Sequence, residues 1–282
     1  MTQQDHYRMS MEERSFPKIG FIGAGQMATA LARGFLQKTG ISAERMRASD
    51  AYEESRKRFH ALTEIKTVQD NRSVAEECDI IILAVKPQVL QDVLQELATV
   101  IKPTHCVISI VAGARLQILE KALPNTRRFF RVMPNTPCLV GQGALAFCLS
   151  DAVTETDLEL VTKLLKSVGR CFLVNEGLMD AVTGLSGSGP AYAFLMIEAL
   201  ADAGVREGIP REIALKLAAE TLRGAAEMVL NTGEHPAVLK DRVTSPAGTT
   251  IAGLQQLESH GVRAAMYAAV HAATERSRDL GK

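Results

Sequence analysis

Lys18-Ile-Gly-Phe-Ile-Gly-Ala-Gly-Gln-Met-Ala28 is the stretch that decides the fold of the N-terminal part of this 282-residue chain. A short apolar run opens it, and the glycines that follow have the spacing G-x-G-x-x-[GA]. Met27, Leu31 and Phe35 then recur at helical spacing. A strand, a glycine turn and a helix in this order are typical of a dinucleotide-binding βαβ unit.

The small residues of this fingerprint have different expected roles. Gly23 makes the tight turn, Gly25 lets a pyrophosphate approach the backbone, and Ala28 allows the helix to pack closely on the strand. The alternative, a tight turn without a ligand, is disfavoured by the strand-to-helix context. We expect this loop to supply the cofactor-binding residues Ile22, Gly23, Ala24, Gly25, Gln26 and Met27.

Strand and helix patterns alternate as far as about Val174. Strands are predicted at 45–49, 80–85, 106–111 and 128–133, and helices at 27–37, 53–62, 89–101 and 116–122. Such alternation indicates βαβ units in a doubly wound parallel sheet. Residues 17–175 are therefore predicted to form an α/β Rossmann-like dinucleotide-binding domain.

The chain after Ala181 is rich in Ala and Leu and reads as helix throughout. Helices are predicted at 191–203, 211–230, 250–259 and 262–278. Residues 191–197 are apolar on every side, and a domain of about a hundred residues struggles to enclose such a helix alone. We expect residues 176–282 to form an all-α dimerisation domain, with a central helix inside one chain as the alternative.

The composition of the chain limits the kinds of partner that it is expected to bind. With 32 basic and 32 acidic residues the formal net charge is zero, so nothing favours nucleic acid or an anionic membrane. The longest apolar runs are too short to cross a bilayer. Residues 1–16 are expected to be a disordered polar leader without a secretory signal.

Cysteine and histidine usage is equally plain. The five cysteines form no C-x-x-C pair, which favours reduced thiols and a cytoplasmic location. The six histidines lack metal-ligand spacing, so no metal site is expected.

Ligands of open α/β sheets bind beyond the carboxyl ends of the strands. The residues expected there are Ala84, Val85, Lys86, Pro87, Ala112, Gly113 and Asn135. A solvated lysine is the alternative for Lys86, and a structural turn is the alternative for Asn135.

The second predicted strand ends at Ser49-Asp50, where the adenosine ribose of a dinucleotide is recognised. An acid there favours a free 2′-hydroxyl, whereas Ser49 with the nearby Arg56 favours a 2′-phosphate. If Ser49 reads the ribose, Asp50 points away. We expect NADPH as the preferred cofactor and keep NADH open.

Small hydroxyl residues crowd a second turn, Asp241-Arg-Val-Thr-Ser-Pro-Ala-Gly-Thr-Thr-Ile-Ala-Gly253. Ser245, Thr249 and Thr250 stand at or near a predicted helix start, where free N–H groups and the helix dipole favour anions. This turn is a place to hold a carboxylate.

Five segments together resemble the pyrroline-5-carboxylate reductase family, from about Lys18 to Leu280. They are Gly20-Phe-Ile-Gly-Ala-Gly-Gln-Met-Ala28, Ala84-Val-Lys-Pro87, Met133-Pro-Asn-Thr-Pro137, Leu185-Ser-Gly-Ser-Gly-Pro-Ala-Tyr-Ala-Phe194, and His235-Pro through Thr250. The resemblance implies NAD(P)H-dependent reduction of the cyclic imine 1-pyrroline-5-carboxylate to L-proline. It also implies an intertwined homodimer, with a decamer of five dimers as a larger assembly.

The same resemblance implies roles for individual residues. Ser245, Gly248 and Thr249 would hold the substrate with Thr250, whose hydroxyl would reach the ring nitrogen as the catalytic contact. Glu176 falls at a family position near the substrate, and Asn71 at one near the adenosine ribose. The family usually has glycine where Ala247 stands, and alanine fits only with negative φ or with strain.

Two other classes of protein compete with this interpretation. A β-hydroxyacid dehydrogenase needs a general base, often a lysine, on an early helix of the helical domain. The predicted helix 191–203 contains no lysine. A nucleotide-sensing binding protein would leave the hydroxyl turn without a purpose.

Overall fold

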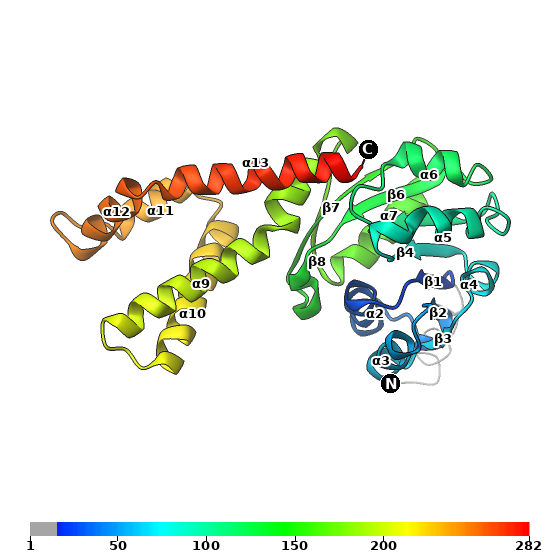
Figure 1. Ribbon diagram of the computed structural model, residues 1–282, viewed down its shortest axis with the longest axis horizontal. Coiled ribbons are helices and arrows are strands. Elements are labelled where there is room, and N and C mark those ends of the chain that lie inside the picture. Colours follow the sequence, from blue (N-terminus) through cyan, green and yellow to red (C-terminus); the bar gives the residue numbers. More distant parts are fainter. Residues whose placement is uncertain (1–15, 282) are drawn as a thin grey trace, which may run out of the picture. The chain divides into compact units, whose positions relative to one another are not determined.

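The structure, a computed structural model, describes residues 16–281 (Figure 1). Contacts divide it into two compact units. One runs to Gly187 and includes the C-terminal segment from Ala273, and the other is Ser188–Ala272. The predicted leader, apart from residue 16, lies outside the described residues, and the domain boundary near Asn175 stays a prediction.

An eight-stranded sheet organises the first unit. Its strands are β1 Ile19–Ile22, β2 Met46–Ser49, β3 Lys66–Val68, β4 Ile80–Leu83, β5 Cys106–Ser109, β6 Arg128–Met133, β7 Gly143–Leu149 and β8 Gly169–Leu173. The order is β3-β2-β1-β4-β5-β6-β7-β8, with β1 to β6 parallel and β7 antiparallel to β6. The order reverses between β1 and β4, which is the ligand-binding switch point of a doubly wound fold. The predicted Rossmann-like fold is confirmed.

Two apolar layers cover the sheet. Residues from α2 (Gln26–Lys38), α3 (Glu53–Thr63) and α7 (Glu155–Lys166) share one buried cluster. Residues from α4 (Asn71–Glu77), α5 (Leu90–Leu97) and α6 (Leu116–Ala122) share the other. Strand β1 serves both, because alternate residues point to opposite faces.

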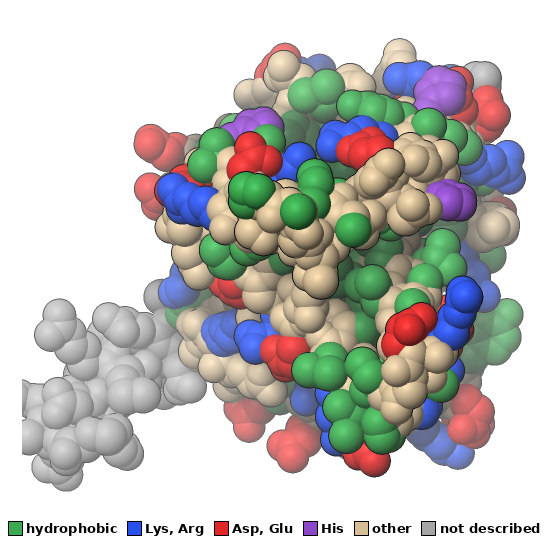
Figure 2. Space-filling view, turned by 90° about the vertical axis from the view of Figure 1, so that its left-hand side faces the viewer, with side chains coloured by type: hydrophobic (Ala, Val, Ile, Leu, Met, Phe, Trp, Pro, Cys, Tyr) green, Lys and Arg blue, Asp and Glu red, His purple; other side chains and the backbone are tan. Residues whose placement is uncertain are grey.

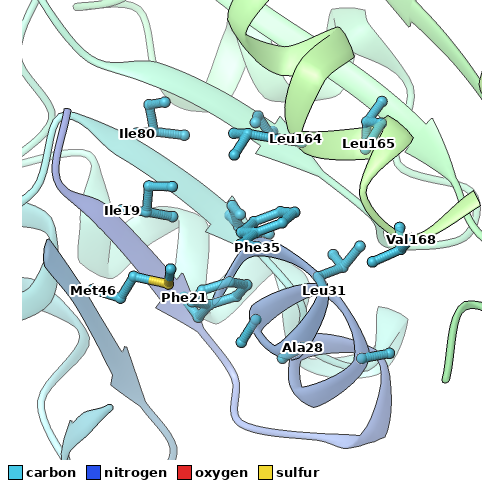
Figure 3. Packing of buried hydrophobic residues seen from close by; sticks show 14 of the residues in the cluster. Ile19, Phe21, Ala28, Leu31, Phe35, Met46, Ile80, Leu164, Leu165 and Val168 are labelled. Atoms are coloured by element: carbon cyan, nitrogen blue, oxygen red, sulfur yellow. The ribbon is translucent and has the colours of Figure 1, made fainter. Parts of the chain in front are cut away.

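Aromatic rings anchor α2 and α3 to β1. The Phe21 ring lies with its centroid 6.0 Å from that of Phe35 and 5.9 Å from that of Phe59. Leu164 and Leu165 of α7 join the same cluster, which Figure 3 shows from close by. This packing fixes the start of α2 at the carboxyl end of β1.

The sequence patterns missed part of this unit. Strands β3, β7 and β8 and helices α4 and α7 were not predicted; β3 has only three residues, and 143–149 lacks strict alternation. The helix predicted at 89–101 is shorter, since Pro87 opens a 3₁₀ turn over Pro87–Val89 and α5 ends at Leu97.

The rest of the chain is helical, as predicted. Its elements are α8 Met179–Val182, a π-helical turn Thr183–Gly187, α9 Gly189–Arg206, α10 Arg211–Thr232, α11 Pro236–Arg242, α12 Thr249–Ser259 and α13 Val262–Leu280. Gly233 follows α10, Gly261 precedes α13, and both have positive φ. Glycine takes that conformation without a steric cost.

Helices α9 and α10 pack through small side chains and leave large ones outside. Ala201, Ala214 and Ala218 are the buried residues of their shared cluster. Phe194 and Leu195 are each 63% exposed. Figure 2 shows further hydrophobic side chains in groups on the face it displays. The alternative of a central helix enclosed by one chain is therefore wrong, and this surface calls for a partner chain.

No helix in residues 16–281 is both long and apolar enough to cross a membrane.

Candidate cofactor and substrate sites

The turn after β1 needs glycine at its first position. Gly23 has φ +102°, and a Cβ added there would lie 2.6 Å from the Ala84 carbonyl oxygen. The Gly23 N–H donates to the Ser49 carbonyl at 2.8 Å. This turn therefore passes directly over the ends of β2 and β4, at the switch point of the sheet.

Helix α2 begins beside open space. Its N-cap is Gly25, with φ −78° and ψ −174°, and no side chain of the described residues caps it. Apart from Gly25 and its two chain neighbours, no described atom lies within 4 Å of a Cβ placed on Gly25. The first N–H groups of α2 are thus available to an anion, and the geometry fits a dinucleotide pyrophosphate.

Asp50 braces this turn and does not point away from it, contrary to the option raised from the sequence. Its Oδ2 accepts the Ala24 N–H at 2.9 Å, and its Oδ1 accepts the Tyr52 N–H at 2.9 Å. Arg56 donates to the carbonyl oxygens of Asp50 at 2.6 Å and Ala51 at 3.1 Å. The end of β2 therefore presents the Asp50 carboxylate, which two backbone amides bind. The Arg56 guanidinium lies beside it and binds two backbone carbonyls.

Ser49 and Asn71 belong to one hydrogen-bonded chain. The fully buried Ser49 hydroxyl donates to Asn71 Oδ1 at 2.7 Å, and Asn71 Nδ2 donates to Glu96 Oε2 at 2.8 Å. The chain links β2 to α4 and α5. Of the two predicted ribose contacts, only Asn71 is partly exposed.

The other predicted cofactor residues gather at the carboxyl ends of the strands. Lys86 is exposed, while Ala84, Val85, Pro87 and Ala112 are half-buried after β4 and β5. Gly113 is buried at φ +78°, where an added Cβ would lie 3.1 Å from the Leu280 backbone. Of the loop residues, Gln26 is exposed, Met27 half-buried, and Ile22 and Ala24 are buried. Contact with Ile22 or Ala24 would therefore be made through their backbone.

Glu176 has protein partners in this structure. Its Oε1 accepts a hydrogen bond from the Leu116 N–H, at the start of α6, at 2.7 Å. The same oxygen accepts a second hydrogen bond from Arg131 Nη1 at 3.2 Å. Arg131 also pairs with Asp180 at 3.5 Å, and the Ser277 hydroxyl donates to Asp180 at 2.7 Å. Sequence reasoning missed this network, although an arginine inside the apolar run of β6 was a signal that buried acids would lie nearby.

The hydroxyl turn starts α12. Gly248 is the N-cap, with φ −81° and ψ 176°, and within the described chain no side chain caps this helix. The Gly248 N–H donates to the Ser245 carbonyl at 3.1 Å, and an added Cβ would lie 2.3 Å from Ser245 Oγ. Ser245 and Thr249 are exposed, and Thr250 is half-buried. Free amides and three hydroxyls thus share one helix start, which suits a carboxylate.

Ala247 adopts the left-handed region, with φ +56°. The condition set from the sequence, a negative φ, is not met, so the residue is strained.

Within residues 16–281, no group of three His, Cys, Asp or Glu side chains is arranged to hold a metal ion.

A Rossmann-like unit with a glycine turn, joined to a helical unit, defines the class of nicotinamide-dinucleotide oxidoreductases. Two family models match: "Pyrroline-5-carboxylate reductase dimerisation" over residues 176–280, and "NADP oxidoreductase coenzyme F420-dependent" over residues 18–113.

Individual relatives agree with these matches. The pyrroline-5-carboxylate reductase of Methanosarcina acetivorans is 49% identical, over 94% of this chain and 98% of its own. That of Arabidopsis thaliana is 44% identical, over 94% and 96%. A crystal structure of the Plasmodium falciparum enzyme with NADP bound superposes with a TM-score of 0.86 and 36% identity, covering 94% of this chain and 98% of that one. The chain belongs to the pyrroline-5-carboxylate reductase family.

The two glycines of the turn provide a matched pair of variants. Gly23→Ala forces a Cβ against the Ala84 carbonyl at positive φ, so we expect a lower melting temperature and weak cofactor binding. Gly25→Ala meets no protein atom, so we expect an unchanged melting temperature but a raised KM for the cofactor. Thermal unfolding and NADPH titration of both variants test this. A normal KM in folded Gly25→Ala would contradict the assigned pyrophosphate position.

Ala247→Gly should stabilise the protein. The left-handed conformation costs an alanine roughly 1–2 kcal/mol of folding free energy, and glycine removes this cost. Glycine also gives the unfolded chain more conformational freedom, which lowers the stability of the folded protein by roughly 0.4–1 kcal/mol. We expect a net gain of about 0.5–1 kcal/mol in the free energy of unfolding, measured by denaturant titration. A loss of stability would show that the turn relaxes around alanine.

Proposed function

We propose that this protein reduces 1-pyrroline-5-carboxylate to L-proline with NADPH, and with NADH as a second cofactor. The observation that carries the proposal is the pair of uncapped helix starts, at Gly25 of α2 and Gly248 of α12, in a chain of this family. The first suits a pyrophosphate and the second a carboxylate. Both ligands are anions that free amides hold well.

The chemistry asks little of the protein beyond placement. A protonated cyclic imine is already electrophilic at carbon, so no strong protein acid is needed. The bound nicotinamide supplies the hydride. The Ser245 hydroxyl and the Thr249 amide, next to the Gly248 N-cap, would hold the substrate carboxylate, and the Thr250 hydroxyl would bond to the ring nitrogen.

The cofactor would lie along the carboxyl edge of the sheet. Residues 22–27 would take the pyrophosphate, and Asn71 with Ser49 would stand near the adenosine ribose. The loops at 84–87 and 112–113 would line the nicotinamide half. Arg56 favours NADPH, because its guanidinium stands beside the end of β2.

Initial rates test the activity directly. NAD(P)H absorbance, followed with and without the cyclic imine, should fall only when the imine is present, and proline should form. Turnover of a β-hydroxyacid with NAD(P)⁺ would favour the dehydrogenase alternative. Cofactor binding without any turnover would favour a nucleotide sensor.

Arg56→Gln should shift cofactor preference. The variant keeps a side-chain donor for the Asp50 carbonyl but loses the positive charge. We expect KM for NADPH to rise about tenfold, in line with the loss of one charged hydrogen bond, and KM for NADH to stay within about twofold. Arg58→Gln, an exposed position on the same helix, is the control. Equal effects on both cofactors would rule out a 2′-phosphate contact.

Thr250→Val removes one hydroxyl and keeps the shape of the side chain. A hydrogen bond to a charged partner contributes about 1.5–3 kcal/mol, so kcat/KM for the imine should fall about ten- to a hundredfold. Because no side chain caps α12, the melting temperature should barely change. Thr249→Val should reduce kcat/KM less, since Thr249 is proposed to bind the substrate carboxylate through its backbone N–H, which valine also has. An intact kcat/KM in Thr250→Val would remove Thr250 from the catalytic site.

The protein is proposed to be a homodimer through residues 181–280, with a decamer of five dimers as the larger assembly. Phe194 is exposed within the chain, so Phe194→Asp should weaken association, and the helical unit should lose stability with it. Sedimentation should give at least twice the chain mass for the parent protein and a smaller species for the variant. A stable, active monomer of the parent protein would refute the proposal.

A cytoplasmic location is proposed from the thiols. All five cysteines are free, and burial raises the pKa of Cys106 to about 12. Unpaired, protonated thiols suit a reducing compartment.

A further inference from the structure

The π-helical turn Thr183–Gly187 packs tightly against the end of β6. A Cβ added to Gly187 would lie 2.5 Å from the terminal methyl carbon, Cε, of Met133, the last residue of that strand. Wide turns of this kind inside helices occur frequently at functional sites. Met133 ends a strand in the half of the sheet where the nicotinamide is proposed to bind, so the turn borders that half.

Pro190 leaves one carbonyl of this turn without its helical donor. In an α-helix the Ser186 carbonyl would accept the N–H of residue 190, and proline has none. The N–H of Ala191, which is the donor that a π-helix would use, bonds to the Ser188 carbonyl at 3.0 Å instead. The Ser186 carbonyl therefore needs a donor from elsewhere in the protein.

Asn135 supplies that donor. Its Nδ2 donates to the Ser186 carbonyl at 3.0 Å, and its Oδ1 accepts the Ala144 N–H at 3.0 Å. The residue is only 7% exposed. The two bonds use both ends of the side-chain amide and join the loop after β6, the start of β7 and the π-helical turn.

We infer that Asn135 is a positioning residue, which holds the π-helical turn at the nicotinamide side of the sheet by replacing the donor that Pro190 lacks. This inference rests on the proposed function for its kinetic consequence. It gives Asn135 a bracing role in place of the direct cofactor contact expected from the sequence. Loss of the brace would misplace the wall beside the reacting atoms and slow hydride transfer more than it weakens cofactor binding.

Asn135→Asp separates the two bonds at a pH where its carboxyl is ionised, because the carboxylate still accepts the Ala144 N–H but cannot donate to Ser186. Burial raises the pKa of such a carboxyl, so the assays are made on the alkaline side, with the parent protein measured at the same pH. We expect kcat to fall about ten- to a hundredfold, the cost of a lost buried hydrogen bond, with KM for NADPH within about twofold. The deuterium isotope effect with 4-deuterated NADPH should rise. Asn135→Ala removes both bonds and should be at least as slow.

Pro190→Ala provides the rescue. It restores an N–H at residue 190, the donor that an α-helical turn would give to the Ser186 carbonyl, so adding it to Asn135→Asp should recover several-fold in kcat. Hydrogen-exchange mass spectrometry should show faster exchange over residues 183–192 in Asn135→Asp and slower exchange in the double variant. This readout needs no turnover, so it tests the brace even if the protein fails to reduce the imine.

Two results would overturn the inference. A large rise in KM for NADPH with unchanged kcat would make Asn135 a cofactor ligand. Unchanged exchange over 183–192 in both single variants of Asn135, or no recovery on adding Pro190→Ala, would show that the turn does not depend on this bond.

Discussion

The close approach of the Gly23 turn to Ala84 is the constraint on which the nucleotide-binding unit depends. Only 2.6 Å separates a Cβ at position 23 from the Ala84 carbonyl oxygen, so no other residue fits without moving β1 or β4. These strands are neighbours at the switch point of the sheet, and α2 starts from the turn. The glycine therefore allows the turn to approach β4 closely and sets the point at which α2 begins.

Both candidate anion sites are helix starts at which glycine is the N-cap residue. Gly25 and Gly248 each serve as the N-cap of a helix, with closely similar backbone angles and without a side-chain cap. A glycine cap gives up little stability compared with Ser or Asp, and it leaves the first amides open to a ligand. The reasons for glycine differ, because Gly25 faces open space whereas Gly248 lies against Ser245 Oγ. Similar geometry thus suits a pyrophosphate in one unit and a carboxylate in the other.

Local patterns predicted the parts of the fold that depend on nearby residues. The glycine fingerprint, strands β1, β2, β4, β5 and β6, and the starts of α2, α9, α10 and α12 are set by neighbours in sequence, and they were placed within a few residues. Partners far along the chain were not visible. The pairing of Glu176 with Arg131 and the Leu116 amide, and of Asn135 with Ser186, depends on which strand ends the fold brings together. The φ of Ala247 was also beyond reach, since a turn can force alanine into a region that glycine prefers.

The helical unit has a different source of stability. Small residues let α9 and α10 approach closely, as at Gly204, where an added Cβ would lie 3.3 Å from the Ala214 Cβ. The price is that large apolar side chains such as Phe194 and Leu195 point outward. The buried residues of the cluster between α9 and α10 are three alanines, with Ile197, Val205 and Ile209 partly buried against them, so burial of the exposed side chains against a partner chain would add to the stability of the unit. Folding of this unit is then linked to association and to protein concentration. Because the hydroxyl turn at Ser245–Thr250 belongs to the same unit, the integrity of the proposed substrate site depends on that association as well.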